Sequence, residues 1–220
     1  GYSNIKKQAK MMNKAFEALQ KKYNFNNFKG LAHSNGGLIY TAFIENYLGD
    51  YDVKINSLMT IGTPYNFTET NIKNKSVMLA DFIAGKKNIP STLHVYSVAG
   101  TITYDSDELV PDASVSAGKY IYQNQAKSYT EITVTGEDAQ HSDLPTNDEV
   151  VELLAGDERS DNGRRLVVNV AHAGSAAVWS IVIPWVGATL LSTMLTENPP
   201  RPPPFSCGGA SQPAQRTVSL

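Results

Sequence analysis

The sequence predicts an α/β fold with a mainly parallel sheet of about four strands flanked by helices. Helical and strand-like segments alternate along the first 154 residues, and this alternation is typical of a parallel sheet covered on both faces. One predicted helix is apolar almost all round, as expected for a helix buried in a sheet protein. The residues that could carry chemistry all lie where predicted strands end.

The first predicted element is an amphipathic helix over residues 5–23. Its apolar positions are separated by alternating steps of four and three residues, with mostly polar residues between them. These positions are Ile5, Ala9, Met12, Phe16, Leu19 and Tyr23. Ser3 stands where an N-cap is expected. The pattern predicts a helix with one buried face.

A short strand and the buried helix come next. Residues 28–33 predict the strand, and the almost uniformly apolar residues 38–47 predict the helix. A glycine-rich turn at residues 34–37 separates the two. The two elements and the turn between them form a strand–turn–helix unit.

The alternation continues to residue 154. Further strands are predicted over residues 55–61, 92–99 and 129–134. Further helices are predicted over residues 77–84, 113–122 and 147–154. In the last helix, Asn147 is the expected cap, and acidic residues occupy the first turn, where the helix dipole favours them.

Composition excludes several classes of protein. The chain of 220 residues is 41% hydrophobic and 18% charged, which is typical of a globular protein. Its net charge of -2 provides no basic surface for nucleic acid. A single cysteine, Cys207, excludes an internal disulfide and any multi-cysteine zinc site.

The composition changes near residues 155–158. All 14 lysines lie between Lys6 and Lys127, whereas all five arginines lie beyond residue 158. Six of the 11 prolines lie between residues 199 and 213. We therefore divide the chain into residues 1–155 and an unrelated or disordered tail, residues 156–220. A change of coding-sequence origin explains the break better than a genuine second domain does.

The tail contains a long stretch without charged side chains, residues 166–196. It is long enough to span a bilayer, which needs about 20 residues. Asn169, His172 and Pro184 interrupt it, so an irregular segment is the alternative. Contact with a membrane is therefore left open by the sequence.

Ser34 is the candidate nucleophile. It lies between a predicted strand and a predicted helix, and its neighbours Ala32, Gly36 and Gly37 are small. A nucleophile elbow needs small neighbours because the serine backbone is strained and the strand and helix pack closely. The Asn35 amide, at the helix N-terminus, would point toward a developing oxyanion. The alternative is an ordinary glycine-rich turn that cradles a phosphate or nothing.

An acid and a base follow the next strands in the order expected of an α/β-hydrolase. Asp107 lies after the third strand and His141 after the fourth, so the chain order is Ser, Asp, His. Asp105 is the competing acid. His33, beside the serine, is expected to pack around the elbow rather than act as a base, and His94 is expected to be structural.

The acidic loop raises the alternative of a metal site. Its carboxylates are Asp105, Asp107, Glu108 and Asp112. They lack the ligand pattern and central glycine of a calcium loop and coincide with the expected triad acid. We expect neither a metal nor a cofactor.

Four segments together resemble the α/β-hydrolases of unknown function known as the DUF915 family, from Gram-positive bacteria. They are Ala-His-Ser-Asn-Gly-Gly, Ile-Gly-Thr-Pro-Tyr, Ser-Asp-Glu-Leu-Val-Pro and His-Ser-Asp-Leu-Pro. The resemblance covers residues 3–154 and implies a serine esterase-like or lipase-like hydrolase at the cell surface, acting on a small-molecule or lipid-like acyl substrate. It makes Ser34 the nucleophile, Asp107 the triad acid and His141 the base.

The chain departs from the family pattern in three places. Ala32 replaces the first glycine of the elbow, and the tail after residue 155 matches nothing in the family. The chain also opens at Gly1 without the strands and the His-Gly loop that come first in this fold, so we expect a partial hydrolase fold. Two consequences are expected: a missing second oxyanion donor, and an exposed sheet edge at residues 28–33. A catalytically inactive fragment, or an interaction module on a hydrolase scaffold, is therefore the alternative function.

Overall fold

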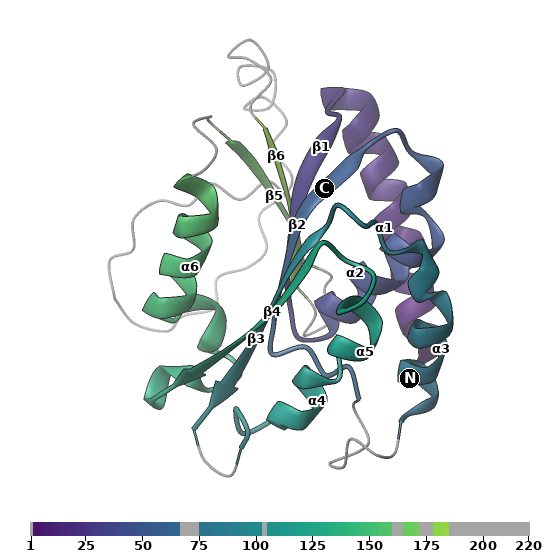
Figure 1. Cartoon of the computed structure of the whole chain (residues 1–220). Coiled ribbons are helices and arrows are strands. Elements are labelled where there is room, and N and C mark those ends of the chain that lie inside the picture. The colour runs from purple at the N-terminus through teal and green to yellow at the C-terminus, as the bar shows by residue number, and fades with distance from the viewer. Residues whose placement is uncertain (1, 67–74, 103–104, 160–164, 172–177, 185–220) are drawn as a thin grey trace, which may run out of the picture.

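The computed structural model describes residues 2–66, 75–102, 105–159, 165–171 and 178–184 (Figure 1). The α-helices are α1 (Tyr2–Tyr23), α2 (Asn35–Asn46), α3 (Val77–Gly85), α4 (Asp112–Ser116), α5 (Lys119–Tyr122) and α6 (Asp148–Arg159). The strands are β1 (Asn27–His33), β2 (Lys54–Ile61), β3 (His94–Thr101), β4 (Ser128–Thr135), β5 (Arg165–Ala171) and β6 (Val178–Pro184). The alternation predicted from the sequence is present from α1 to α6.

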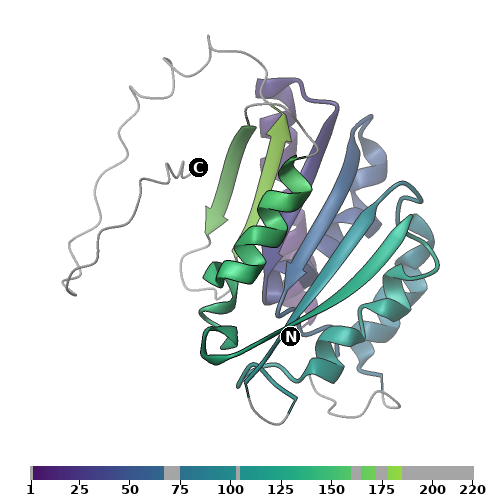
Figure 2. The ribbon, with the colours of Figure 1, turned by 60° about the vertical axis from the view of Figure 1, so that its left-hand side comes forward.

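The strands form one sheet in the order β4-β3-β2-β1-β6-β5. Strands β1 to β4 are parallel, which confirms the predicted four-strand parallel sheet. Strand β6 runs antiparallel to β1, and β5 runs antiparallel to β6. Figure 2 shows this second part of the sheet continuing the first beyond β1.

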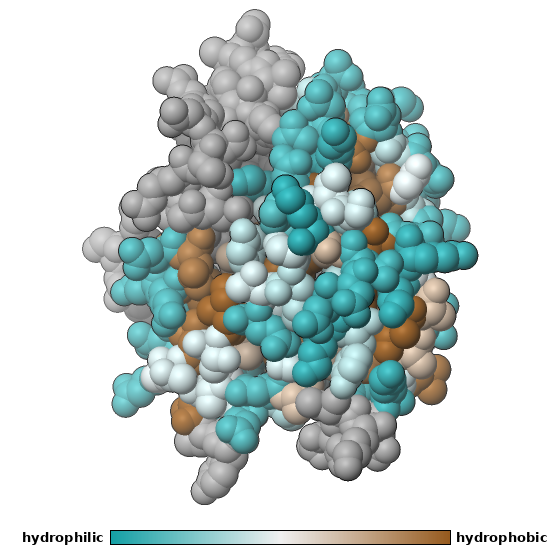
Figure 3. Space-filling model, in the orientation of Figure 1, coloured by the Kyte–Doolittle hydropathy of each residue, from teal (hydrophilic) through white to brown (hydrophobic). Residues whose placement is uncertain are grey.

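Helices cover both faces of the sheet. In Figure 1, α1, α2, α3 and α5 lie on one side and α6 on the other. The larger hydrophobic core lies on the α1–α2 side, and a smaller cluster that includes Met59, Val98 and Val150 lies on the side of α6. In the view of Figure 3 the surface is mainly hydrophilic, with hydrophobic residues in separate groups.

Helix α1 buries the face that its sequence pattern predicts. All six apolar positions that define the 4-3-4-3-4 spacing are buried. Phe16 is the centre of this contact, because its ring lies 4.9 Å from that of Phe28 on β1 and 5.0 Å from that of Phe43 on α2. The predicted cap is wrong, since the helix begins at Tyr2 and Ser3 lies inside it.

Helix α2 is buried all round, as predicted, and even includes a buried carboxyl group. Residues 36–45 are all buried, and the side chain of Glu45 packs against α3 where Gly85 leaves room for it. A Cβ at Gly85 would lie 2.5 Å from Glu45 Oε2. Glu45 Oε1 has no hydrogen-bond partner among the described residues. Burial, with a smaller contribution from Asp81, raises the pKa of Glu45 to about 8.

Two other elements differ in detail from their predictions. The predicted helix 113–122 is divided into α4 and α5, with the break at residues 117–118. A Cβ at Gly118 would lie 2.8 Å from the ring of Tyr65, so the chain at this break must pass close to a buried aromatic ring. The predicted cap of α6 is confirmed, because Asn147 Oδ1 accepts a hydrogen bond of 2.9 Å from the Glu149 amide.

The expectation of an exposed edge at residues 28–33 is wrong. Strand β6 pairs with β1 along Lys29–His33, with Ala32 opposite Trp179. The valine- and isoleucine-rich segments 165–171 and 178–184 favour extended backbone, and the hydrogen-bonding groups along β1 provide a partner for it. The expectation that residues 156–220 contribute few contacts to the sheet is therefore wrong for these two segments. Residues 185–220, with Trp185 and Cys207, lie outside the described residues.

The uncharged stretch, residues 166–196, for which the sequence left a membrane span or an irregular segment open, also includes most of these two strands. Within the described part of the chain, no helix is both long and apolar enough to cross a bilayer. Where residues 166–196 are described, they form strands β5 and β6.

Candidate active site

Ser34 lies at a sharp turn between the end of β1 and the start of α2. Its backbone has φ 54° and ψ -129°, a conformation that is strained for a residue with a side chain. The end of β2 holds this turn from both sides. The Ser34 amide donates to the carbonyl oxygen of Ile61 at 2.8 Å, and Thr63 Oγ1 donates to the carbonyl oxygen of Ser34 at 3.0 Å. These are the properties of a nucleophile elbow.

The small residues around Ser34 are required by close packing. A Cβ at Gly37 would lie 2.2 Å from Thr63 Oγ1, so a larger residue there would collide with the side chain that holds the turn. Ala32 is buried with 1% of its surface exposed. The alanine thus fits the first glycine position of the elbow motif in this chain.

Asp107 is fully buried in the loop after β3 and uses its two oxygens differently. Oδ1 accepts hydrogen bonds from the amides of Leu109 at 3.0 Å and Val110 at 2.6 Å. Oδ2 lies 2.6 Å from Nδ1 of His141. The two backbone amides orient the carboxylate, so its second oxygen faces the imidazole.

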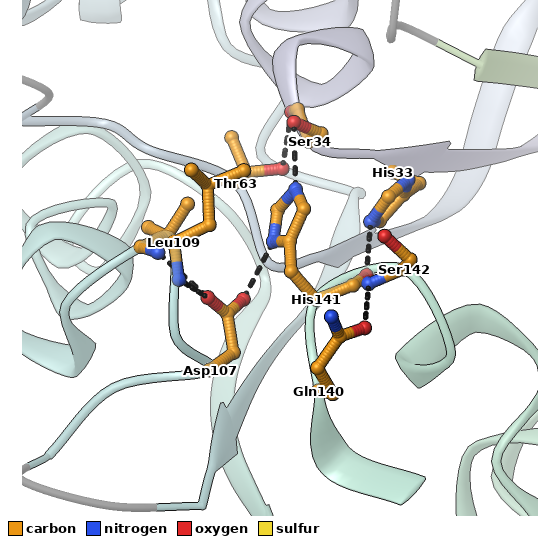
Figure 4. Close-up of polar contacts among 9 residues, drawn as sticks. His33, Ser34, Thr63, Asp107, Leu109, Gln140, His141 and Ser142 are labelled. Carbon is orange, nitrogen blue, oxygen red and sulfur yellow. Dashed lines mark hydrogen bonds and ion pairs between the residues drawn. The ribbon is translucent and has the colours of Figure 1, made fainter.

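His141 lies between the carboxylate and the serine (Figure 4). Its Nε2 is 3.0 Å from Ser34 Oγ, and its Nδ1 faces Asp107. A carboxylate only accepts hydrogen bonds, so we assign the imidazole proton to Nδ1, which leaves Nε2 free to accept from the serine hydroxyl. Ser34 and His141 are only 5% and 6% exposed, so this proton path is shielded from bulk water.

The structure thus brings together the three residues that the sequence selects. They come from the ends of β1, β3 and β4, as expected for parallel strands whose carboxyl ends meet at one edge. Asp107, rather than Asp105, faces the imidazole. The backbone carbonyl of Asp105 instead accepts from the amide of Asp112 at 2.9 Å, a contact that closes the acid loop.

Asn35 is the first residue of α2. Its amide is among the first four of the helix, which have no intrahelical acceptor, and it follows directly on the serine. Such an amide is suited to an oxyanion because the helix dipole also favours negative charge there. Asn35 thus stands at the helix N-terminus, and its oxyanion role stays a prediction.

The two other histidines of the sequence analysis lie in different surroundings. His94 Nδ1 is 2.8 Å from Ser128 Oγ on the neighbouring strand, which fits a structural role. His33 lies beside the site, with Nε2 2.9 Å from the carbonyl oxygen of His141. Burial and the nearby His141 lower the pKa of His33 to about 4, so it is neutral at physiological pH.

Sequence reasoning missed two residues that shape the site. Gly62 follows β2 with φ +55°, and a Cβ there would lie 3.1 Å from both Asp107 Oδ2 and His141 Nδ1. Thr63 is fully buried and supports the elbow as described above. Both belong to the Ile-Gly-Thr-Pro-Tyr segment, whose spacing alone does not show that it contacts loops more than 40 residues away.

No metal site accompanies these groups in the described ranges. No three His, Cys, Asp or Glu side chains among them are grouped so that they could hold a metal ion. The carboxylates of the acid loop do not converge, because Asp107 faces His141 while Asp112 Oδ2 accepts from Thr101 Oγ1 at 2.5 Å.

Comparison with protein families identifies the class of protein that this fold and site define. The family described as alpha/beta hydrolase of unknown function (DUF915) matches residues 2–156. The match covers more than half of the chain, and the chain belongs to this family. Among the curated proteins, none matches.

Solved structures agree with this assignment. A protein from Lactobacillus plantarum, named provisionally as a cell surface hydrolase, is 47% identical with a TM-score of 0.67, and the match covers 74% of this chain and 66% of that one. A gene product from Listeria innocua is 29% identical with a TM-score of 0.64, over 68% and 64% of the two chains. The present chain thus spans slightly less than two thirds of either protein.

A third structure shows likeness of fold alone. It is a thermostable carboxyl esterase from Bacillus coagulans, 12% identical with a TM-score of 0.50, and the match covers 69% of this chain and 70% of that one.

Proposed function

We propose that this protein is a serine hydrolase that cleaves an ester, thioester or amide bond through an acyl-enzyme. The observation that carries the proposal is the position of His141, with Nε2 3.0 Å from Ser34 Oγ and Nδ1 2.6 Å from Asp107 Oδ2. A nucleophile and base within hydrogen-bond reach, with the base oriented by a third group, is the arrangement that nucleophilic catalysis needs.

The residues have distinct roles in this mechanism. Ser34 Oγ attacks the acyl carbonyl carbon while His141 Nε2 takes the serine proton, and the carbonyl oxygen becomes an oxyanion near the Asn35 amide. Asp107 stabilises the imidazolium that forms. The imidazolium then gives its proton to the leaving group as the bond to that group breaks, which produces the acyl-enzyme. Water, activated by the same imidazole, attacks the acyl-enzyme and releases the acid.

We propose a small-molecule or lipid-like acyl compound as substrate, since the strained serine and the buried base are suited to acyl transfer. The provisional name of the Lactobacillus plantarum relative supports a location at the cell surface.

Labelling with a fluorophosphonate tests the proposal, because this probe forms a covalent adduct with an activated serine. Intact-mass measurement should show one adduct on the wild-type chain and none on Ser34→Ala. Ser142→Ala removes an exposed serine next to His141 and should still be labelled. A folded wild-type chain that gives no adduct, or an adduct that survives in Ser34→Ala, would reject the proposal in favour of a catalytically inactive scaffold.

A further inference from the structure

His33 makes a contact that the mechanism above does not use. It is the last residue of β1 and is covalently joined to Ser34. Its Nε2 lies 2.9 Å from the carbonyl oxygen of His141, and the two imidazole rings are 4.6 Å apart at an interplanar angle of 41°. Figure 4 shows this contact next to the triad. The residue before the nucleophile is therefore bonded to the backbone of the base.

This contact determines which ring nitrogen of His33 carries the proton. A carbonyl oxygen only accepts hydrogen bonds, so His33 Nε2 must carry the proton and donate it. The charged or titratable groups that act on the His33 ring are His141 and Asp107. Because His33 is uncharged above pH 5, it does not oppose the positive charge that His141 acquires when it takes the serine proton.

The backbone of His141 is thus held at both of its polar groups. Its amide donates to the carbonyl oxygen of Asp107 at 2.9 Å, and its carbonyl oxygen accepts from His33. The bond from His33 and the contact between His141 Nε2 and Ser34 Oγ close a ring of contacts through His33, Ser34 and His141. The elbow is therefore linked to His141 at two points, the backbone carbonyl oxygen and the imidazole.

We propose that His33 is a positioning residue that holds the base at hydrogen-bond distance from the nucleophile by donating a hydrogen bond to the backbone of His141. The inference rests on the proposed hydrolase function. It differs from the general-base role that a histidine beside a catalytic serine could also have, because His33 directs its proton to a carbonyl oxygen and not to the serine.

Two substitutions at this position separate the effect of the hydrogen bond from the effect of the imidazole's volume. In His33→Gln, the side-chain amide nitrogen can occupy the place of Nε2 and donate to the same carbonyl oxygen. His33→Leu fills a similar volume without a donor. We expect the fluorophosphonate labelling rate to stay within about threefold of wild type for His33→Gln and to fall about 10- to 100-fold for His33→Leu, as for a displaced catalytic group.

The pH profile and a matched control exclude a merely structural effect. In His33→Leu the maximal labelling rate should fall while the midpoint of its pH dependence stays in place, because the base itself is retained. His94→Leu removes a strand histidine away from the site and should leave the rate unchanged. Equal losses in His33→Gln and His33→Leu, or no loss in His33→Leu, would overturn the inference.

Nuclear magnetic resonance tests the inference independently of activity. Nitrogen shifts of the imidazole should show His33 as the Nε2–H tautomer, titrating near pH 4, and His33→Leu should shift the carbonyl carbon signal of His141. A His33 that carries its proton on Nδ1 would refute the positioning role even in an active enzyme. If the wild type has this tautomer but no fluorophosphonate adduct, the proposed function fails while the hydrogen bond stands.

Discussion

Gly62→Ala tests whether the imidazole–carboxylate pair depends on the glycine that lies against it. The new Cβ would lie 3.1 Å from Asp107 Oδ2, 3.1 Å from His141 Nδ1 and 3.2 Å from His141 Cε1. Ordinary contacts of a Cβ lie at 3.4–4 Å, so the pair must move by a few tenths of an ångström. Both side chains are buried, which leaves them little room to move without changing their mutual geometry.

The expected magnitudes separate activity from stability. Because a misplacement of about 1 Å can cost about a hundredfold in rate, a shift of a few tenths should lower the labelling rate about tenfold. The left-handed φ of +55° adds a backbone cost of about 1 to 2 kcal/mol, which corresponds to a fall in Tm of roughly 2 to 8 °C for a chain of this size. Fluorophosphonate labelling and thermal unfolding measure the two effects on the same sample.

Gly136→Ala is the matched control. Gly136 also has a positive φ, of +115°, but a Cβ there would meet nothing within 4 Å. This variant should lose stability without a comparable loss in labelling rate. A labelling rate for Gly62→Ala within twofold of wild type would refute the reasoning, as would an equal loss in Gly136→Ala.

Three further predictions concern the acid, a buried carboxyl group and the added strands. Asp107→Asn should lower kcat by about 10⁴-fold, whereas Asp105→Asn should have little effect; an inactive Asp105→Asn beside an unchanged Asp107→Asn would reverse the assignment. Glu45 has a raised pKa of about 8, so the folded state keeps this proton while the unfolded state loses it, and the stability of the wild type should fall as pH rises from about 4.5 to 8. Urea unfolding at several pH values should show that Glu45→Gln removes roughly 3 to 5 kcal/mol of this fall in the free energy of unfolding. If the free energy of unfolding has the same pH dependence in both chains, the assigned burial effect is contradicted. Hydrogen exchange should show protected amides in residues 165–171 and 178–184, and exchange there as fast as in a free peptide would contradict their pairing with the sheet.

The parts of the fold that depend on local pattern could be predicted from the sequence. The apolar spacing in residues 5–23 is sufficient to predict α1, because the buried face of a helix is apolar at regular spacing. The site residues Ser34, Asp107 and His141 could be selected because each follows a strand in the order of a known arrangement. The parallel order of those strands brings the three residues to one edge of the sheet.

The remaining features depend on contacts between distant segments. The uncharged run 166–196 is compatible with a membrane span, an irregular segment or strands. Pairing of β6 with β1, and of β5 with β6, selects strands where the run is described. In the same way, the glycine at position 62 shows its importance only when two loops close over it.

The change in composition near residue 155 also shows that a local sequence pattern does not reveal contacts between distant segments. Lysine gives way to arginine there, yet β6 beyond the change is bonded to β1 before it. Our hypothesis about the coding origin of the tail stays a prediction, since a compositional boundary and a boundary in hydrogen bonding need not coincide.

The hydrogen bonds that hold the elbow and its surroundings have a practical consequence. Ser34 is bonded through its amide to the end of β2, and Gly62 is bonded through its amide to Val98 of β3. The elbow and Gly62 are therefore bonded to the central strands, so this part of the site should lose its form only when the sheet unfolds. A compound that binds the intact site then stabilises the whole domain and raises its melting temperature by an amount that grows with the logarithm of its concentration divided by its Kd. Thermal-shift screening of acyl compounds against Ser34→Ala, which can bind but not turn over, offers a direct route to the unknown substrate.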